Sequence, residues 1–117
     1  MALHALSPRE LARTHTLFRG FLGRDANRRS TVSELLSIYR ERCGDLHPAQ
    51  DPDDDLRVGR FIDDMAKGRW MDRLVMRIGE FDGRVLLIDG THRAVAYLSC
   101  LESGISADRL PALYVDC

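Results

Sequence analysis

The sequence predicts an α+β protein with a small mixed sheet. Over residues 8–67 the apolar residues recur at helical spacing, whereas from residue 74 they gather in short runs typical of strands. An amphipathic segment over residues 91–103 then returns to the helical period. At 117 residues, with 44% hydrophobic and 30% charged residues, the chain is long enough to bury one core of its own.

The first expected helix begins at a capping signal. Ser7 is a favoured N-cap residue, Pro8 suits the first helical position, and Glu10 can complete a capping box with Ser7. The apolar residues that follow have partly helical spacing, so the helix is expected to run on until Gly20 and Gly23 end it.

Two further helices are expected before the strands. One begins at Ser30 or Thr31, runs to about Arg42 and ends at Cys43-Gly44. A polar loop over residues 47–55 follows, with two prolines and four aspartates. Its last residues, Asp54 or Asp55, can cap a third helix that stops at Gly68.

A hairpin, a helix and a strand complete the predicted order. Residues 74–78 and 85–88 are the expected strands of a hairpin, joined through Asp82-Gly83, a strong turn signal. A helix over residues 91–103 and a short strand over residues 113–115 follow.

The predicted elements divide the chain into two parts of one compact unit. Residues 1–50 form a helical extension, and residues 51–117 form the core on which it packs. Trp70, which stands between the third helix and the hairpin, is expected to anchor the core or the hairpin.

The junction between the second hairpin strand and the following helix carries the strongest functional signal. The first backbone N–H groups of a helix have no intrahelical partner, and the helix dipole places partial positive charge there. Gly90 lets a ligand approach the backbone, and Arg93 occupies a first turn where a cation is disfavoured unless it faces an anion. The pattern therefore predicts a phosphate site.

Each residue of this junction has an expected chemical role. Thr91 adds a hydroxyl, His92 donates to phosphate oxygens, and Arg93 grips two of them. Asp89 holds Mg²⁺ or acts as general base. A purely structural alternative stays open, because Asp89 and Thr91 are common capping residues and Gly90 a common turn residue. Other general bases also stay open: Glu34, Asp63, Asp64, Asp72 and Glu80.

Residues 87–97, which read Leu-Ile-Asp-Gly-Thr-His-Arg-Ala-Val-Ala-Tyr, resemble the signature of the ParB/sulfiredoxin superfamily. In that superfamily a strand, a glycine and a His-Arg pair at a helix start bind nucleotide phosphates. The order of elements over roughly residues 54–116 is also similar to the family core. The resemblance implies a ParB/sulfiredoxin-like fold, ATP, ADP or CTP with Mg²⁺ as cofactors, and Arg77 as a further phosphate contact.

Departures from the family pattern narrow the expected activity. Sulfiredoxins carry their catalytic cysteine where this chain has Thr91, so their chemistry is not expected. The chain stops at Cys117, where partition proteins continue into a DNA-reading domain. The Asp-Gly-x-His-Arg form resembles that of small-molecule kinases, which implies a nucleotide-dependent phosphotransferase or nucleotidase acting on a small hydroxylated metabolite.

Two other functions stay open at this point. A ParB-like nuclease or DNA-associated regulator is supported by the arginine group Arg24, Arg28 and Arg29, although a net charge of −1 gives no broad basic surface. A non-catalytic nucleotide-binding interaction protein fits the same junction. A homodimer is compatible with the sequence.

Cysteine spacing and hydropathy exclude several other classes. Cys43, Cys100 and Cys117 have neither zinc-site spacing nor the even number of a disulfide framework, and Cys100 is expected to be buried. No signal-like segment begins the chain, and no apolar run is long enough for a bilayer. A cytoplasmic location without membrane contact is therefore expected.

Overall fold

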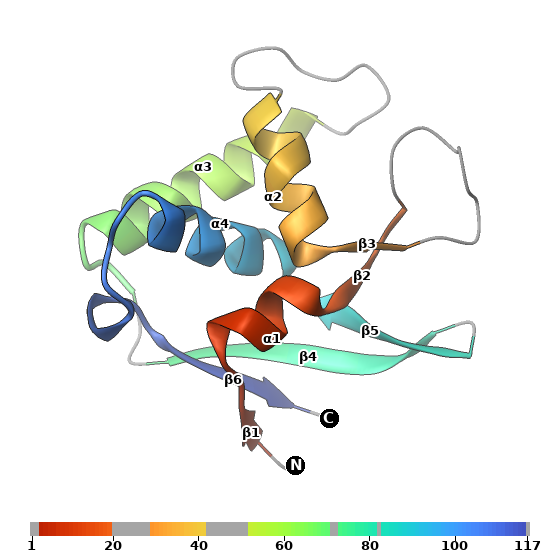
Figure 1. Cartoon of the computed structure of the whole chain (residues 1–117). Helices are drawn as coiled ribbons and strands as arrows, with labels where there is room; N and C mark the ends of the chain where they lie inside the picture. Colours follow the sequence, from red (N-terminus) through yellow and green to blue (C-terminus); the bar gives the residue numbers. More distant parts are fainter. Residues whose placement is uncertain (1–2, 20–28, 42–51, 71–72, 82, 117) are drawn as a thin grey trace.

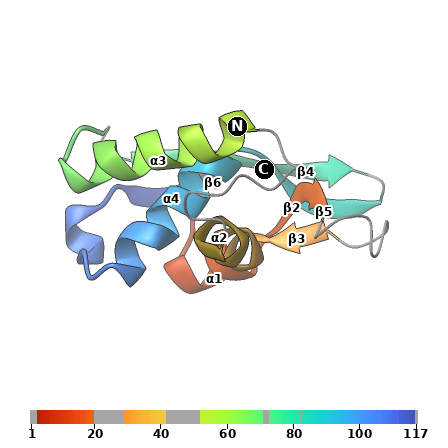
Figure 2. The same ribbon diagram turned by 90° about the horizontal axis from the view of Figure 1, so that it is seen from above.

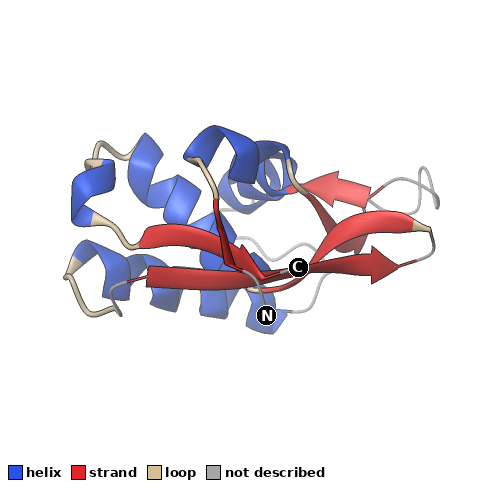
Figure 3. Cartoon of the chain, turned by 90° about the horizontal axis from the view of Figure 1, so that it is seen from below, coloured by secondary structure: helices blue, strands red, loops and turns tan. Residues whose placement is uncertain are grey.

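In the computed structural model, the helices cover one face of a mixed β-sheet (Figures 1 and 3). It describes residues 3–19, 29–41, 52–70, 73–81 and 83–116. The helices there are α1 (Pro8–Arg13), α2 (Val32–Glu41), α3 (Pro52–Ala66), α4 (Thr91–Glu102) and the short 3₁₀ helix η2 (Ala107–Arg109). The strands are β1 (Leu3–Ala5), β2 (His15–Arg19), β3 (Arg29–Thr31), β4 (Arg73–Phe81), β5 (Arg84–Asp89) and β6 (Ala112–Asp116). The predicted α+β class is confirmed.

The six strands form one sheet in the order β1-β6-β4-β5-β2-β3. The predicted hairpin of β4 and β5 lies at its centre and pairs antiparallel from Phe81↔Arg84 to Arg77↔Asp89. On one side β6 runs parallel to β4, and on the other β2 runs parallel to β5. Strands β1 and β3 close the two edges in antiparallel pairs.

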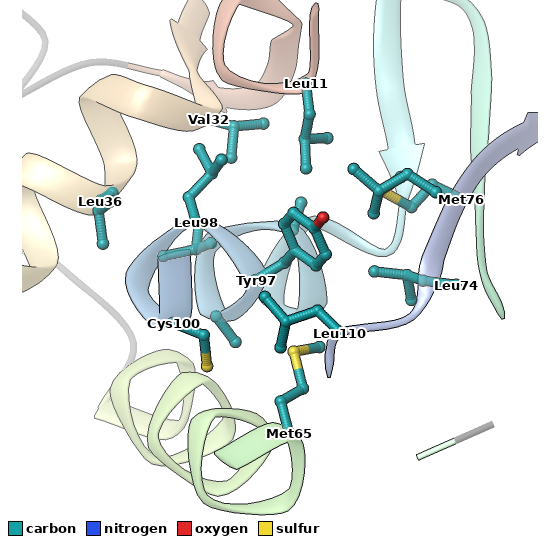
Figure 4. Packing of buried hydrophobic residues seen from close by; sticks show 14 of the residues in the cluster. Leu11, Val32, Leu36, Met65, Leu74, Met76, Tyr97, Leu98, Cys100 and Leu110 are labelled. Carbon is teal, nitrogen blue, oxygen red and sulfur yellow. The ribbon is translucent and has the colours of Figure 1, made fainter. Parts of the chain in front are cut away.

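Helix α4 is the centre of the hydrophobic core. It lies between α2 and α3 when the molecule is viewed from above (Figure 2). Its residues 94–98 are all buried, and two of them, Ala94 and Ala96, are fully inaccessible. Figure 4 shows side chains from α1, α2, α3 and β4 around Tyr97 and Leu98. This packing fixes the direction in which the first turn of α4 points.

Within the described residues, no helix is long and apolar enough to cross a membrane.

Two predicted helix starts are confirmed by their hydrogen bonds. At α1 the Ser7 Oγ accepts from the Glu10 N–H at 3.1 Å, and Glu10 Oε1 accepts from the Ser7 N–H at 3.1 Å. At α2 the Thr31 Oγ1 accepts from the Glu34 N–H at 3.2 Å, so the helix starts at the second of the two predicted positions. Glu34 therefore serves as a capping residue.

We expect Ser7→Ala to lower the free energy of unfolding by about 0.5–2 kcal/mol, because it leaves a helix N–H without its partner. Urea denaturation measures the change. The control is Ser106→Ala, since Ser106 is the N-cap of η2 but makes no side-chain cap hydrogen bond. An equal loss in both variants would contradict the capping argument.

The hydrogen bonds between Ser7 and Glu10 also predict how the stability of the protein changes at acid pH. Hydrogen bonds from Ser7, first from its backbone and then from its side chain, lower the pKa of Glu10. A carboxyl whose pKa is lowered by folding contributes stability above its ordinary pKa, and this stability is lost as the pH falls through the lowered value. Stability curves of Glu10→Gln and the wild type should therefore converge in acid, and a constant difference down to acid pH would contradict this role.

Helix α3 starts earlier than predicted and ends where predicted. Its first residue is Pro52, so the expected capping role of Asp54 or Asp55 is wrong. Proline is favoured at the first helical position because its missing N–H needs no partner there. At the other end Gly68 has a φ of 70°, and the N–H groups of Gly68 and Arg69 donate to the carbonyls of Met65 and Asp64. These two bonds form a Schellman motif.

The predicted first helix is too long. Helix α1 ends at Arg13, Thr14 adopts an extended conformation, and residues 15–19 form β2. Thr16 is fully buried in β2, and its Oγ1 donates to the Ser30 carbonyl at 2.9 Å. Pairing with β5 and β3 on its two sides outweighs the partly helical spacing of the apolar residues.

The N-terminal part of the chain is consequently not a purely helical extension, because it supplies β1, β2 and β3 of the sheet. These strands are absent from the sequence-based prediction. Several other predicted features lie outside the described residues: Gly20, Gly23, Arg24, Arg28, Arg42, Cys43, Gly44, Asp72, Asp82, Cys117 and the loop up to residue 51.

Candidate functional site

Helix α4 begins directly after β5, as the sequence predicts. Gly90 is its N-cap and Thr91 its first residue, so neither Asp89 nor Thr91 occupies the cap position. Because Gly90 has no side chain, the start of α4 has no side-chain cap hydrogen bond from its N-cap residue. The first intrahelical bond runs from the Ala94 N–H to the Gly90 carbonyl at 2.9 Å. The N-cap residue therefore supplies no side-chain acceptor to the N–H groups of the first turn.

Gly90 is required by two separate features of the turn. Its φ of 93° lies in the left-handed region, which side-chain-bearing residues rarely adopt. A Cβ atom added there would stand 2.8 Å from Met76 Cγ, and Met76 is almost completely buried in β4. The turn is thus packed directly on the central strand, which holds the start of α4 in place.

A hollow of about 350 Å³ lies at this turn and will be called the α4 hollow. Four of the residues predicted for the phosphate site line it: Asp89, Gly90, Thr91 and His92. Thr91 is buried and His92 half-buried, whereas Asp89 is exposed. Leu17 and Ile88 add apolar wall. The structure therefore brings the central part of the predicted site together at one surface depression.

Arg57 of α3 also lines the α4 hollow. It was not identified as a site residue from the sequence. It places a guanidinium on the same hollow as the positive end of the α4 dipole, which suits an anion. Arg57 lies far from the junction in the sequence, and only the packing of α3 beside α4 places it there. No local pattern marks it out among the arginines of the chain.

Arg93 and Arg77 do not line the α4 hollow. The Arg93 guanidinium lies over the Phe61 ring, 5.1 Å from its centroid, and lines a different hollow. Arg77 is an exposed residue of β4 that pairs with Asp89 in the strand register. Both arginines therefore lie outside the lining of the α4 hollow, although Arg77 lies beside Asp89 in the sheet.

The other acidic candidates that the structure describes do not line the α4 hollow. Asp63 Oδ2 accepts from Arg69 at 2.9 Å and from Lys67 at 3.2 Å. The Lys67 hydrogen bond is the largest of the contacts that lower the pKa of Asp63, so this carboxyl is held in its charged form. Asp64 pairs with Arg69, and Glu80 is exposed on β4. Asp89 is the carboxylate that faces the α4 hollow among the described residues.

The arrangement offers no preformed metal cage in the part of the chain that is described. There, no group of three or more His, Cys, Asp or Glu side chains is placed to hold an ion. Cys100 is fully buried, as predicted, and burial raises the pKa of its thiol. It therefore packs as a small apolar residue rather than as a nucleophile.

Comparison of this chain with protein-family models, curated proteins and solved structures finds no match.

Proposed function

We propose that this chain is a nucleotide-dependent phosphotransferase or nucleotidase that binds phosphates in the α4 hollow. One observation carries the proposal: the uncapped first turn of α4 meets Arg57 and His92 at a single hollow. Backbone N–H groups at a helix start and an arginine fork are the two protein groups that best match phosphate oxygens.

The proposed roles follow from the positions of the lining residues. The N–H groups of Thr91 and His92 donate to the oxygens of one phosphate group. The Arg57 guanidinium donates to the oxygens of a second phosphate group. His92 adds a ring donor for charge that develops during transfer. The phosphate contacts first expected from Arg93 and Arg77 are thus assigned to Arg57 instead, because it is Arg57 that lines the hollow.

Asp89 is the residue proposed to face Mg²⁺ or the attacking hydroxyl. A single carboxylate suits Mg²⁺ in nucleotide sites, because the ion takes most of its other ligands from phosphate oxygens and water. When bound, the ion would neutralise phosphate charge. Asp89 is also exposed, so a small hydroxylated substrate can reach its carboxylate as a general base.

We also propose that the sheet is a ParB/sulfiredoxin-like core with additional N-terminal strands. The succession of β4, β5, Gly90, α4 and a β6 that runs parallel beside β4 supports this assignment. The support rests on topology and on the motif over residues 87–97, and a fold alone does not specify a reaction.

Arg57→Ala is expected to weaken nucleotide binding by about tenfold or more, because a charge-assisted hydrogen bond to phosphate is lost. Calorimetric titration with ATP, ADP and CTP, each with Mg²⁺, measures the change. The matched control is Arg60→Ala, which removes another exposed arginine of α3 that does not line the hollow.

A turnover assay distinguishes an enzyme from a protein that only binds nucleotide. Wild-type protein should convert one of the three nucleotides in the presence of a panel of hydroxylated metabolites, and Asp89→Asn and His92→Ala should slow this reaction without abolishing binding. Binding with no turnover of any nucleotide would contradict phosphoryl transfer. Absence of nucleotide binding by the wild type would overturn the proposal as a whole.

A further inference from the structure

A second hollow, larger than the first, has no place in the proposed reaction. It measures about 460 Å³, and its lining residues come mainly from the end of α3 and from the starts of β4 and β6. We call it the tryptophan hollow, because Trp70 lines it. Trp70 is the single tryptophan of the chain.

Three arginines line the tryptophan hollow, and they differ in their ion pairs with the described carboxylates. Arg69 pairs with Asp63 at 2.9 Å and with Asp64 at 3.2 Å, so its charge is matched by carboxylates. Arg73 and Arg93 also line the hollow, and within the described residues neither has a carboxylate partner. The chain as a whole has a net charge of −1, so this pair is a local concentration of positive charge.

Aromatic rings hold both of these guanidinium groups in place. Arg93 lies over Phe61 at 5.1 Å from the ring centroid, and Arg73 lies over Tyr114 at 6.0 Å. Such cation–π contacts restrict a flexible side chain before any ligand arrives. A restrained fork loses less conformational entropy when it binds an oxyanion.

Asp64, whose carboxylate pairs with Arg69, also lines the hollow, and apolar side chains form the rest of the wall. Met65 and Leu74 are buried members of the core, and Trp70 packs against that core. The Trp70 Nε1 atom is buried and has no hydrogen-bond partner among the described residues. Because this atom is buried, the indole presents apolar ring surface to the hollow, as the neighbouring Met65 and Leu74 do.

We propose that the tryptophan hollow is a binding site for a small aromatic oxyanion. The ring of the ligand packs on Trp70, Met65 and Leu74. Its carboxylate or phosphate group accepts hydrogen bonds from the guanidinium groups of Arg73 and Arg93. The proposal concerns residues outside the α4 hollow and needs no nucleotide, so it stands or falls separately from the proposed enzyme activity.

The single tryptophan makes this site directly observable, because intrinsic fluorescence excited at the indole reports on Trp70 alone. Titration of the full chain with phenylacetate is expected to change this fluorescence with a Kd on the order of 1 mM, as suits a ligand of this size. Phenyl phosphate tests the phosphate version of the ligand, and uncharged phenylacetamide tests whether the anion is needed.

Arg73→Gln and Arg93→Gln should each weaken binding of the anionic probes by about tenfold, because a charge-assisted hydrogen bond is lost. Arg60→Gln should bind like the wild type, since Arg60 does not line the hollow. Far-UV circular dichroism confirms that each variant is folded. Saturation by phenylacetate alone would identify a carboxylate ligand, and saturation by phenyl phosphate alone a phosphate ligand.

Three outcomes would overturn the site. The first is equal binding of phenylacetamide, which would mean that the arginines do not select an anion. The second is unchanged binding by folded Arg73→Gln and Arg93→Gln variants. The third is no fluorescence response of the wild type to either anion at concentrations about tenfold above the expected Kd.

Discussion

Gly90→Ala should lower the free energy of unfolding by about 2–5 kcal/mol and distort the α4 hollow. Part of the loss comes from the φ of 93°, which costs a side-chain-bearing residue about 1–2 kcal/mol. The rest comes from the new Cβ, which would stand 2.8 Å from Met76 Cγ. Met76 is 1% exposed and has little room to move away. Urea denaturation measures the loss, and calorimetry with nucleotide measures the effect on binding.

Gly104→Ala is the matched control for this prediction. Gly104 follows the other end of α4 with a φ of 99°, and an added Cβ there would meet nothing within 4 Å. It therefore carries the backbone strain without the contact. We expect Gly104→Ala to cost about 1–2 kcal/mol and to leave ligand binding unchanged. If Gly90→Ala costs no more than Gly104→Ala, the close packing of the turn on Met76 is not a source of rigidity.

The junction could be predicted from the sequence because it is local. A run of apolar residues from Val85 to Ile88, a glycine and a helical period occupy consecutive positions, and the structure places Asp89 to His92 at one hollow. The direction of Arg93 could not be predicted in the same way. Successive helical side chains point about 100° apart, so which of the two neighbours His92 and Arg93 faces the hollow depends on where α3 packs.

Non-local pairing explains what the sequence did not predict. The residues after Arg13 have apolar spacing compatible with a helix, but residues 15–19 lie between β5 and β3 in the sheet. Likewise β1 is three residues long and exposed, so its own residue pattern does not predict a strand. It forms a strand because it pairs with β6. Strand propensity depends strongly on such neighbours.

The two hollows share the same pair of helices. Arg57 and Phe61 are one turn apart on α3, and His92 and Arg93 are neighbours in the first turn of α4. Arg57 and His92 line the α4 hollow, whereas Phe61 and Arg93 line the tryptophan hollow. The contact between Arg93 and Phe61 therefore lies on the border of the second hollow, close in sequence to the lining of the first.

Leu87→Ala is expected to destabilise the protein by about 3–5 kcal/mol, the upper part of the range for buried leucines. Leu87 is fully inaccessible in the central strand β5, where it pairs with Ile78 of β4 on one side and with Thr16 of β2 on the other. These ladders hold the backbone on both sides, so the surroundings cannot close the cavity left by the lost methyl groups. Urea denaturation monitored by circular dichroism gives the change.

Val85→Ala on the same strand is the control for the cavity argument. Val85 is 70% exposed, so its truncation should change the free energy of unfolding by no more than about 0.5 kcal/mol. Leu87 also lies three residues before the N-cap of α4, and its loss should loosen the end of β5 that positions Gly90. Nucleotide binding by Leu87→Ala should therefore weaken even where the variant remains folded. A loss of stability as small as that of Val85→Ala would contradict the central place of Leu87 in the core.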